Sequence, residues 1–374
     1  MKTALVHDWL YSVSGAEKVL ESIYNLFPSK VYTLIYNRKR MQNFSIPKEA
    51  IRTSFIQTLP LASKFYPYYL PFFPFAIESF NVSDADVVLS SSSCVAKGIL
   101  TTSSQLHICY CHTPMRSLWE LYFDCLETHR LNHGLKGIVT KFLLHKIRNW
   151  DLLHAIRVDH FIANSKHVAK RIEKTYRRKA TVIYPPIDCD YFQLSTKSNE
   201  GFYLTAARLV PYKKVDLIVK AFTELKNRKL IVIGDGPELC NLKAIASPSI
   251  EFIGYVSQEE LKKYFGLAKA FVYMAHEDFG LFPVEAQATG LPIIAYGRGG
   301  SVETVLDRQT GILFPEQTVA SLIEGIKTFE SFESKFDKKI IRQHAETFST
   351  SNFQYAFKNF VKEKYAEFVC GQPL

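Results

Sequence analysis

Two glutamates stand eight positions apart in the stretch HEDFGLFPVEAQATGLPIIA, residues 276–295. Glu277 follows the buried apolar run AFVYMA, and Glu285 lies near the start of a helix that ends at Gly290. Gly280 stands between them, where the absence of a side chain lets the backbone approach a ligand closely. Such carboxylates can form an acid and base pair, can complement a helix dipole, or can accept hydrogen bonds from one elongated ligand. Their place at a strand end favours a ligand site.

Cations follow an earlier strand of the same half, in the stretch AARLVPYKKVDLIVKAF. Arg208 comes after the apolar run FYLTAA, and Lys213 and Lys214 come five and six residues later, before an amphipathic helix. A planar guanidinium and a compact ammonium held at a strand end can neutralise a diphosphate. A solvated charged loop is the alternative, and the glutamate loop in the same half favours the diphosphate site.

The first half of the chain places two further candidates at strand ends. Gly15 follows the first apolar run and begins a helix with apolar residues at helical spacing, so its backbone amide can meet a phosphate or a sugar. His112 ends the apolar run HICYCH, and Arg116 and Trp119 come shortly after it. A structural histidine is the alternative, but a strand terminus favours a catalytic or binding role.

Neither cysteines nor aspartates in this sequence indicate a metal site. Cys109 and Cys111 lie on one face of a strand with no second cysteine pair, so we expect reduced core thiols. Asp84 and Asp86 precede a strand, away from the carboxyl ends, and predict a turn. The Gly-Asp-Gly after residue 233 lacks the further glycine of the dinucleotide fingerprint, and no GxxxxGK[ST] sequence occurs.

Short apolar runs alternate with helical patterns along the whole chain, which predicts an α/β fold with two doubly wound, Rossmann-like parallel sheets. We expect the domains at 1–186 and 187–350, with the joint marked by Pro185 and Pro186, and a terminal helix over 351–374 that crosses back to the first domain. The two domains are expected to face an interdomain cleft. The expected strands lie within 3–9, 31–36, 86–92, 107–112, 160–165 and 180–185, and then 201–209, 229–236, 250–255, 270–275, 291–296 and 311–314.

The net charge of +10 is concentrated in the first half. Residues 1–200 hold 25 Lys and Arg against 16 Asp and Glu, whereas residues 201–374 hold 21 against 20. This asymmetry is typical of proteins that meet nucleic acid, anionic lipid or an anionic substrate. The segment Phe65–Ile77 is aromatic and interrupted by three prolines, which favours either a loop packed on its own domain or a surface that touches a membrane. Asp8 interrupts the first apolar run, so no secretion signal is expected.

Together these motifs resemble the retaining GT-B glycosyltransferases of family four. The resemblance is carried by EDFGLFPVE, RLVPYKK, GGSVETV and TGILF in the second half, and by YCHTPMRSLW, HFIANSKHVAKRI and VIYPPID in the first half. The first-half motifs are most similar to the subgroup that uses GDP-mannose. Two positions depart from the family pattern: Ser14 replaces the first glycine of a Gly-Gly pair, and Lys214 replaces the glycine of a Lys-Gly pair.

The resemblance implies a role for each candidate residue. Arg208 and Lys213 would bind the donor diphosphate and stabilise the leaving group. Glu277 would hold hydroxyls of the donor sugar beside the backbone of Phe279, Gly280 and Leu281. Glu285 would hold the ribose. His112 would lie near the anomeric carbon, and Gly15 near the phosphates or the acceptor.

The expected function is transfer of a hexose to a lipid-linked or oligosaccharide acceptor in surface polysaccharide biosynthesis. The expected hexose is mannose, and its expected donor is GDP-mannose. Positioned cations can stabilise a departing nucleoside diphosphate, so we expect no metal or other cofactor. The resemblance implies retention by front-face attack. We expect no nucleic-acid partner and a cytoplasmic protein, peripheral on the membrane. The alternatives are a nucleotide-sugar epimerase or hydrolase on the same scaffold, and a non-enzymatic binder of anionic surfaces.

Overall fold

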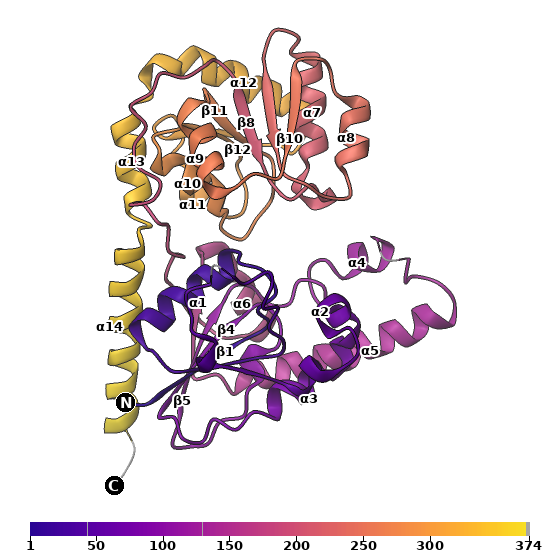
Figure 1. Cartoon of the computed structure of the whole chain (residues 1–374), viewed down its shortest axis with the longest axis vertical. Coiled ribbons are helices and arrows are strands. Elements are labelled where there is room, and N and C mark those ends of the chain that lie inside the picture. Colours follow the sequence, from indigo (N-terminus) through magenta and orange to yellow (C-terminus); the bar gives the residue numbers. More distant parts are fainter. Residues whose placement is uncertain (43, 129, 372–374) are drawn as a thin grey trace. The chain divides into compact units, whose positions relative to one another are not determined.

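The computed structural model describes residues 1–42, 44–128 and 130–371 and divides them into two compact units (Figure 1). The first unit comprises Met1–Pro186 and the chain from Phe353 onward, and the second comprises Ile187–Asn352. Each unit contains one parallel sheet, with strand order β3-β2-β1-β4-β5-β6-β7 in the first and β10-β9-β8-β11-β12-β13 in the second. The prediction of two doubly wound parallel sheets is confirmed.

The central strands are short and buried, as expected for sheets covered on both faces, whereas the edge strands β3, β7 and β10 are partly exposed. The strands of the first unit are β1 (Thr3–His7), β2 (Lys30–Thr33), β3 (Ile51–Thr53), β4 (Val87–Ser92), β5 (Leu106–Cys111), β6 (His160–Ala163) and β7 (Ala180–Val182). Those of the second unit are β8 (Tyr203–Ala206), β9 (Leu230–Ile233), β10 (Ile250–Gly254), β11 (Ala270–Tyr273), β12 (Ile293–Tyr296) and β13 (Gly311–Phe314). Every expected strand is present. The three-residue edge strand β3 was not expected, because it is too short to show a periodic pattern.

Helices cover both sheets. The first unit has α1 (Gly15–Leu26), α2 (Ala62–Phe65), α3 (Phe73–Glu78), α4 (Tyr122–Thr128), α5 (Gly134–Ile156), α6 (Lys166–Tyr176) and α14 (Thr350–Cys370), with the 3₁₀ helices η1 (Lys48–Ala50), η2 (Phe55–Thr58), η3 (Tyr66–Phe72) and η4 (Ala96–Gly98). The second unit has α7 (Val215–Glu224), α8 (Leu239–Ile245), α9 (Gln258–Leu267), α10 (Leu281–Ala288), α11 (Ser301–Thr304), α12 (Val319–Phe332) and α13 (Lys338–Glu346), with η5 (Pro211–Lys213) and η6 (Glu333–Lys335).

The last helix, α14, packs on the first unit although it follows the second unit in the chain. Phe353, Phe357 and Val361 are buried and belong to a core cluster that also contains residues of α1, β1, β4 and β5. The Phe353 ring meets Tyr110 of β5 edge-on, with the ring centroids 5.9 Å apart. The apolar positions of the terminal helix therefore complete the first core.

The aromatic segment between Phe65 and Ile77 forms short helices where the sequence predicted an irregular segment. Pro71 lies inside η3, and the helix changes to α3 at Phe73, so prolines break the segment into short pieces. Phe73 and Ile77 are buried in the first unit, whereas Tyr68 and Phe75 are 80% and 66% exposed. The segment thus packs on its own unit and still presents aromatic rings to solvent.

In each sheet the strand order reverses next to the strand that comes first in the chain, β1 in the first unit and β8 in the second. The first reversal lies between β1 and β4, and the second between β8 and β11. Loops that leave adjacent parallel strands toward opposite sides of the sheet open a crevice at the carboxyl ends, and ligands of such folds bind there. We therefore expect the ligand site in the segments that come after β1, β4, β5, β8 and β11.

Candidate functional site

Lys213 and Glu277 form an ion pair across the reversal point of the second sheet. Lys213 ends η5, in the loop after β8, and Glu277 lies in the loop after β11. The ammonium Nζ donates to Oε1 of Glu277. Their side chains are 13% and 21% exposed, so the pair is largely shielded and still reachable. The two residues that the sequence placed at strand ends are thus brought into direct contact.

Tyr273, the last residue of β11, holds the other carboxylate oxygen of Glu277. Its hydroxyl donates to Oε2. Burial, with the nearby Tyr212 and Asp278, raises the pKa of Tyr273 well above its ordinary value, so the phenol keeps its proton and remains a donor. With one oxygen bound to Lys213 and the other to Tyr273, the Glu277 side chain is fixed in one orientation. The sequence did not point to Tyr273, because an aromatic residue at the end of an apolar run is typical of any buried strand.

The turn after Glu277 depends on glycines. Gly280 has φ +86°, in the left-handed region that favours glycine, and it immediately precedes α10. The N–H of Gly300 donates to the carbonyl of Glu277 at 2.8 Å, and a Cβ on Gly300 would lie 2.3 Å from Phe279 Cα. The loop after β12 therefore supports the glutamate loop by direct backbone contact.

Phe279 and Leu281 flank this turn in different environments. The Phe279 side chain is buried against Phe348, with ring centroids 5.5 Å apart, so only its backbone lies on the ligand side of the turn. Leu281 is half-buried and begins α10.

Glu285 and Arg208 differ in accessibility. Glu285 lies in α10 and is 4% exposed. Arg208 is exposed in the segment between β8 and η5. The structure brings Lys213 and Glu277 together and leaves Arg208 and Glu285 outside that ion pair.

His112, directly after β5, lies at one end of a buried polar chain. Its Nε2 is 2.8 Å from Oγ of Ser91, and Ser91 Oγ is 3.1 Å from Nδ1 of His7. The other nitrogen of His7, Nε2, lies 3.5 Å from Oε1 of Glu17. These residues come from β4, β1 and α1, so the chain crosses the reversal point of the first sheet.

The carboxylate at the far end sets the direction of this polar chain. Burial alone would raise the pKa of Glu17, but hydrogen bonds from His7 and Ser14 lower it below its ordinary value, so Glu17 is ionised. With a neutral His7, Nε2 would donate to Glu17 and Nδ1 would accept from Ser91. The Ser91 oxygen would then be free to accept from Nε2 of His112. Sequence reasoning missed His7, Ser91 and Glu17, since residues 84 positions apart meet only through strand pairing.

Gly15 is the first residue of α1, next to Ser14. The Ser14 backbone N–H donates to Oε2 of Glu17 at 2.9 Å. The Ser14 hydroxyl also donates to Oε2 of Glu17, a contact that a glycine could not make with the glutamate that ends the polar chain. Gly15 keeps its place at the helix start.

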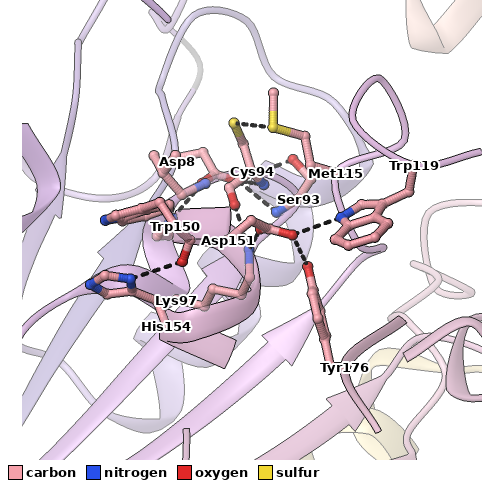
Figure 2. Close-up of polar contacts among 12 residues, drawn as sticks. Asp8, Ser93, Cys94, Lys97, Met115, Trp119, Trp150, Asp151, His154 and Tyr176 are labelled. Carbon is pink, nitrogen blue, oxygen red and sulfur yellow. Dashed lines mark hydrogen bonds and ion pairs between the residues drawn. The ribbon is translucent and has the colours of Figure 1, made fainter. Parts of the chain in front are cut away.

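A buried ion pair holds the segment that comes after His112 (Figure 2). Asp151 of α5 lies 2.5 Å from Lys97 Nζ and also accepts from Trp119 Nε1 at 2.8 Å and from the Tyr176 hydroxyl at 2.9 Å. Burial would lower the pKa of Lys97, but the adjacent Asp151 raises it above its ordinary value, so the pair is charged. Trp119, seven residues after His112, is thereby tied to α5.

The cysteines and aspartates show no sign of a metal site. Cys109 and Cys111 are buried thiols, and burial raises the pKa of Cys111 well above its ordinary value. Asp86 accepts from the Lys2 backbone N–H at 2.6 Å, and Asp84 lies 3.4 Å from Lys30 Nζ. Within the described ranges, no three His, Cys, Asp or Glu side chains are grouped closely enough to hold an ion. None of the described helices has the length and apolarity that a membrane span needs.

Two family models match consecutive parts of the chain. Glycosyltransferase Family 4 matches residues 14–191, and Glycosyl transferases group 1 matches residues 188–347. The chain belongs to the family-four glycosyltransferases. This confirms the resemblance found in the sequence. The boundary between the two matched parts lies near the joint of the two units at Pro186 and Ile187.

Curated relatives match this glycosyltransferase over part of their length. A D-inositol 3-phosphate glycosyltransferase of a Nocardioides species is 28% identical over 193 residues, which covers 41% of this chain and 42% of the relative. A GDP-mannose-dependent alpha-(1-6)-phosphatidylinositol monomannoside mannosyltransferase of Mycobacterium tuberculosis is 31% identical over 137 residues, 32% of this chain and 36% of the relative. The matched part is less than two thirds of each relative.

Solved structures support the fold over nearly the whole chain. The family-four glycosyltransferase superposes on the crystal structure of Anabaena Alr3699/HepE in complex with UDP-glucose with a TM-score of 0.71 and 16% identity, covering 97% of this chain and 100% of that one. The GT-B fold class is confirmed.

Proposed function

We propose that this protein transfers mannose from GDP-mannose to a lipid-linked or oligosaccharide acceptor, with retention of the anomeric configuration, at the cytoplasmic face of the membrane. The observation that carries the proposal is the Lys213 and Glu277 ion pair at the carboxyl ends of β8 and β11. A fixed cation next to a fixed carboxylate suits a donor that joins a diphosphate to a polyhydroxylated sugar. The Mycobacterium tuberculosis relative, a GDP-mannose-dependent phosphatidylinositol monomannoside mannosyltransferase, supports both the donor and a lipid acceptor.

In the proposed reaction, negative charge grows on the diphosphate as the bond to the sugar breaks. Lys213 lies in a largely shielded position, where its charge interacts more strongly than in water. Arg208 adds a mobile guanidinium that can follow the leaving group. Because these residues supply the positive charge, we propose that transfer needs no metal ion.

The proposed roles of the other residues follow from their orientation. Glu277 accepts hydrogen bonds from sugar hydroxyls, and its two partners keep it oriented before the donor binds. Glu285 contacts the ribose. His112, held at Nε2 by Ser91, contacts the donor sugar near the anomeric carbon. Gly15 presents its backbone to the phosphates or the acceptor.

A donor panel tests this proposal. The purified protein is incubated with GDP-mannose, UDP-glucose, UDP-galactose or ADP-glucose and with polyprenyl-diphosphate sugars as acceptors, and mass spectrometry reads the products with and without EDTA. We expect a mannosylated acceptor from GDP-mannose, unchanged by EDTA. Glu277→Gln is expected to lower kcat/KM about 10- to 100-fold, the range for a hydrogen bond to a charged group.

A matched control is Glu316→Gln, an exposed glutamate that follows β13 at the same edge of the sheet. It should leave transfer unchanged. Product without acceptor would indicate an epimerase or hydrolase instead. Consumption of none of the donors would overturn the proposal.

A further inference from the structure

The first half of α5 exposes an apolar surface that the candidate site does not use. Leu135, Ile138, Val139 and Phe142 are 78%, 68%, 49% and 58% exposed, and we name these four residues the α5 patch. At 3.6 residues per turn they lie on one face, within roughly 100° of the helix circumference. Neighbouring exposed apolar residues of this size mark an interaction surface.

Other side chains of α5 are firmly packed on the first unit. Ile147 is buried, and Leu144 and Trp150 pack against the same core cluster, which also contains Phe73 and Ile77. Trp150 Nε1 also donates to Glu78 at 2.6 Å, which ties α5 to α3. The α5 patch therefore belongs to an anchored helix, whose outward face is apolar.

The exposed charges on α5 beside the patch have one sign. Lys136, Lys141 and Lys146 of α5 are exposed, and the Lys146 ammonium lies 5.4 Å from the centre of the Phe142 ring. The sequence has no Asp or Glu between Glu127 and Asp151. Asp151 is buried in its ion pair with Lys97, so α5 presents no acidic side chain to solvent.

We propose that the α5 patch and these three lysines dock the protein onto an anionic lipid bilayer, with α5 lying in the headgroup region. An apolar stripe flanked by lysines fits that boundary, because the apolar side chains enter the acyl region while the ammonium groups remain beside the phosphates. A second copy of this chain is a poorer occupant. A two-fold interface on this face would place the lysines of one copy against those of the other.

The proposal assigns the membrane contact to α5, whereas the sequence pointed to Phe65–Ile77. That segment carries Lys64 as its one nearby lysine, and three of its seven rings, Tyr66, Tyr69 and Phe73, are packed inward. It can add Tyr68 and Phe75 to the contact, but it lacks the basic rim. The inference rests on the proposed function for its purpose, since a lipid-linked acceptor requires an enzyme held at the bilayer.

Vesicle co-sedimentation of the full chain tests the docking surface without donor or acceptor. The vesicles are pure phosphatidylcholine, or phosphatidylcholine with about one third phosphatidylglycerol. The wild type is expected to bind the anionic vesicles and to release them as salt is raised. The variant Lys136→Gln/Lys141→Gln/Lys146→Gln should lose about fivefold in affinity per lysine, or about 100-fold in all.

The apolar part is tested by Leu135→Ser/Ile138→Ser/Phe142→Ser, which should lower vesicle affinity at least tenfold. Its matched control is Ile340→Ser/Tyr355→Ser/Val369→Ser, which changes three exposed apolar residues on α13 and α14. That control should bind like the wild type. Far-UV circular dichroism and the melting temperature should be unchanged in all three variants, because every altered residue is exposed.

Three other outcomes would each overturn the assignment of the membrane contact to α5 and its lysines. Equal binding to neutral and anionic vesicles would remove the role of the lysines. Binding that survives the α5 changes but is lost with Tyr68→Ser/Phe75→Ser would move the contact to the aromatic segment. A dimer of the wild type, dissolved by the α5 changes without vesicle binding, would make the patch a self-association surface. Transfer to a soluble acceptor is unaffected by any of these results, so failure here is distinct from failure of the proposed function.

Discussion

Oγ of Ser91 lies 2.8 Å from Nε2 of His112, at adjacent carboxyl ends of the first sheet. One position earlier in β4, Oγ of Ser90 lies 2.8 Å from Nε2 of His107, which belongs to β5. Successive strand residues point to opposite faces, so one pair meets the polar chain of His7 and Glu17 and the other is enclosed in the core. Two similar contacts therefore have different expected roles.

Ser91→Ala is expected to lower kcat about 10- to 100-fold with little change in KM, because His112 loses the hydrogen-bond partner that orients its ring. Steady-state kinetics with the donor found active in the panel measures this effect. Ser90→Ala is the matched control and should reduce stability while kcat is retained. Equal losses of kcat in both variants would show that Ser91 acts only through folding.

Tyr273→Phe is expected to lower kcat/KM about tenfold, the effect of losing one hydrogen bond to a charged group. The Glu277 carboxylate would keep Lys213 but lose its second restraint. Isothermal titration of the donor should show the same direction in affinity. Tyr212→Phe, on the neighbouring loop and 46% exposed, is the control and should behave like the wild type. A Tyr273→Phe enzyme with wild-type kinetics would contradict the orienting role.

Lys214→Gly is expected to raise the free energy of unfolding by about 0.5 kcal/mol. Lys214 has φ +54°, a left-handed conformation that costs about 1–2 kcal/mol for a residue with a Cβ, and the greater chain entropy of glycine offsets part of that gain. The departure from the family's Lys-Gly pair thus keeps the glycine-like backbone. Urea unfolding measures the change. Lys220→Gly, inside α7, should instead cost about 1 kcal/mol, and a similar loss at Lys214 would contradict the argument.

His107 should make the protein less stable in acid. Burial, with the nearby Arg157, lowers the pKa of His107 from 6.5 to about 3. The unfolded chain binds a proton below pH 6.5 and the folded chain does not, so stability falls as the pH drops from about 6.5 toward 3. From pH 7 to pH 5 this group alone should cost about 2 kcal/mol.

The pH effect is measured by urea unfolding at pH 7 and pH 5. His160 and His344 also have pKa values lowered by burial, so the wild type loses stability through more than one histidine. The loss in His107→Gln should be smaller than in the wild type by about 2 kcal/mol. An identical loss in both proteins would exclude His107 as a source of the acid sensitivity.

The local pattern of the sequence was sufficient for the sheets and for several positions in the candidate site. The apolar runs of the strands are buried on both faces, so each run is visible without knowledge of its neighbours. Arg208, Lys213, Glu277 and His112 come shortly after such runs, and parallel strands bring the loops at their carboxyl ends to one edge of the sheet. Position along the chain therefore predicts which edge these side chains occupy.

Tertiary structure alone decided which of these side chains meet. The reversal of strand order sets β8 beside β11, which joins Lys213 to Glu277, and sets β1 beside β4, which joins His7 to Ser91. It also decided that the outward face of α5 is apolar. Leu135 and Ile147 are both aliphatic residues of this helix, and they differ only in the residues that pack over them. Strand order and burial depend on contacts between distant segments, and the spacing of residues within one segment does not encode them.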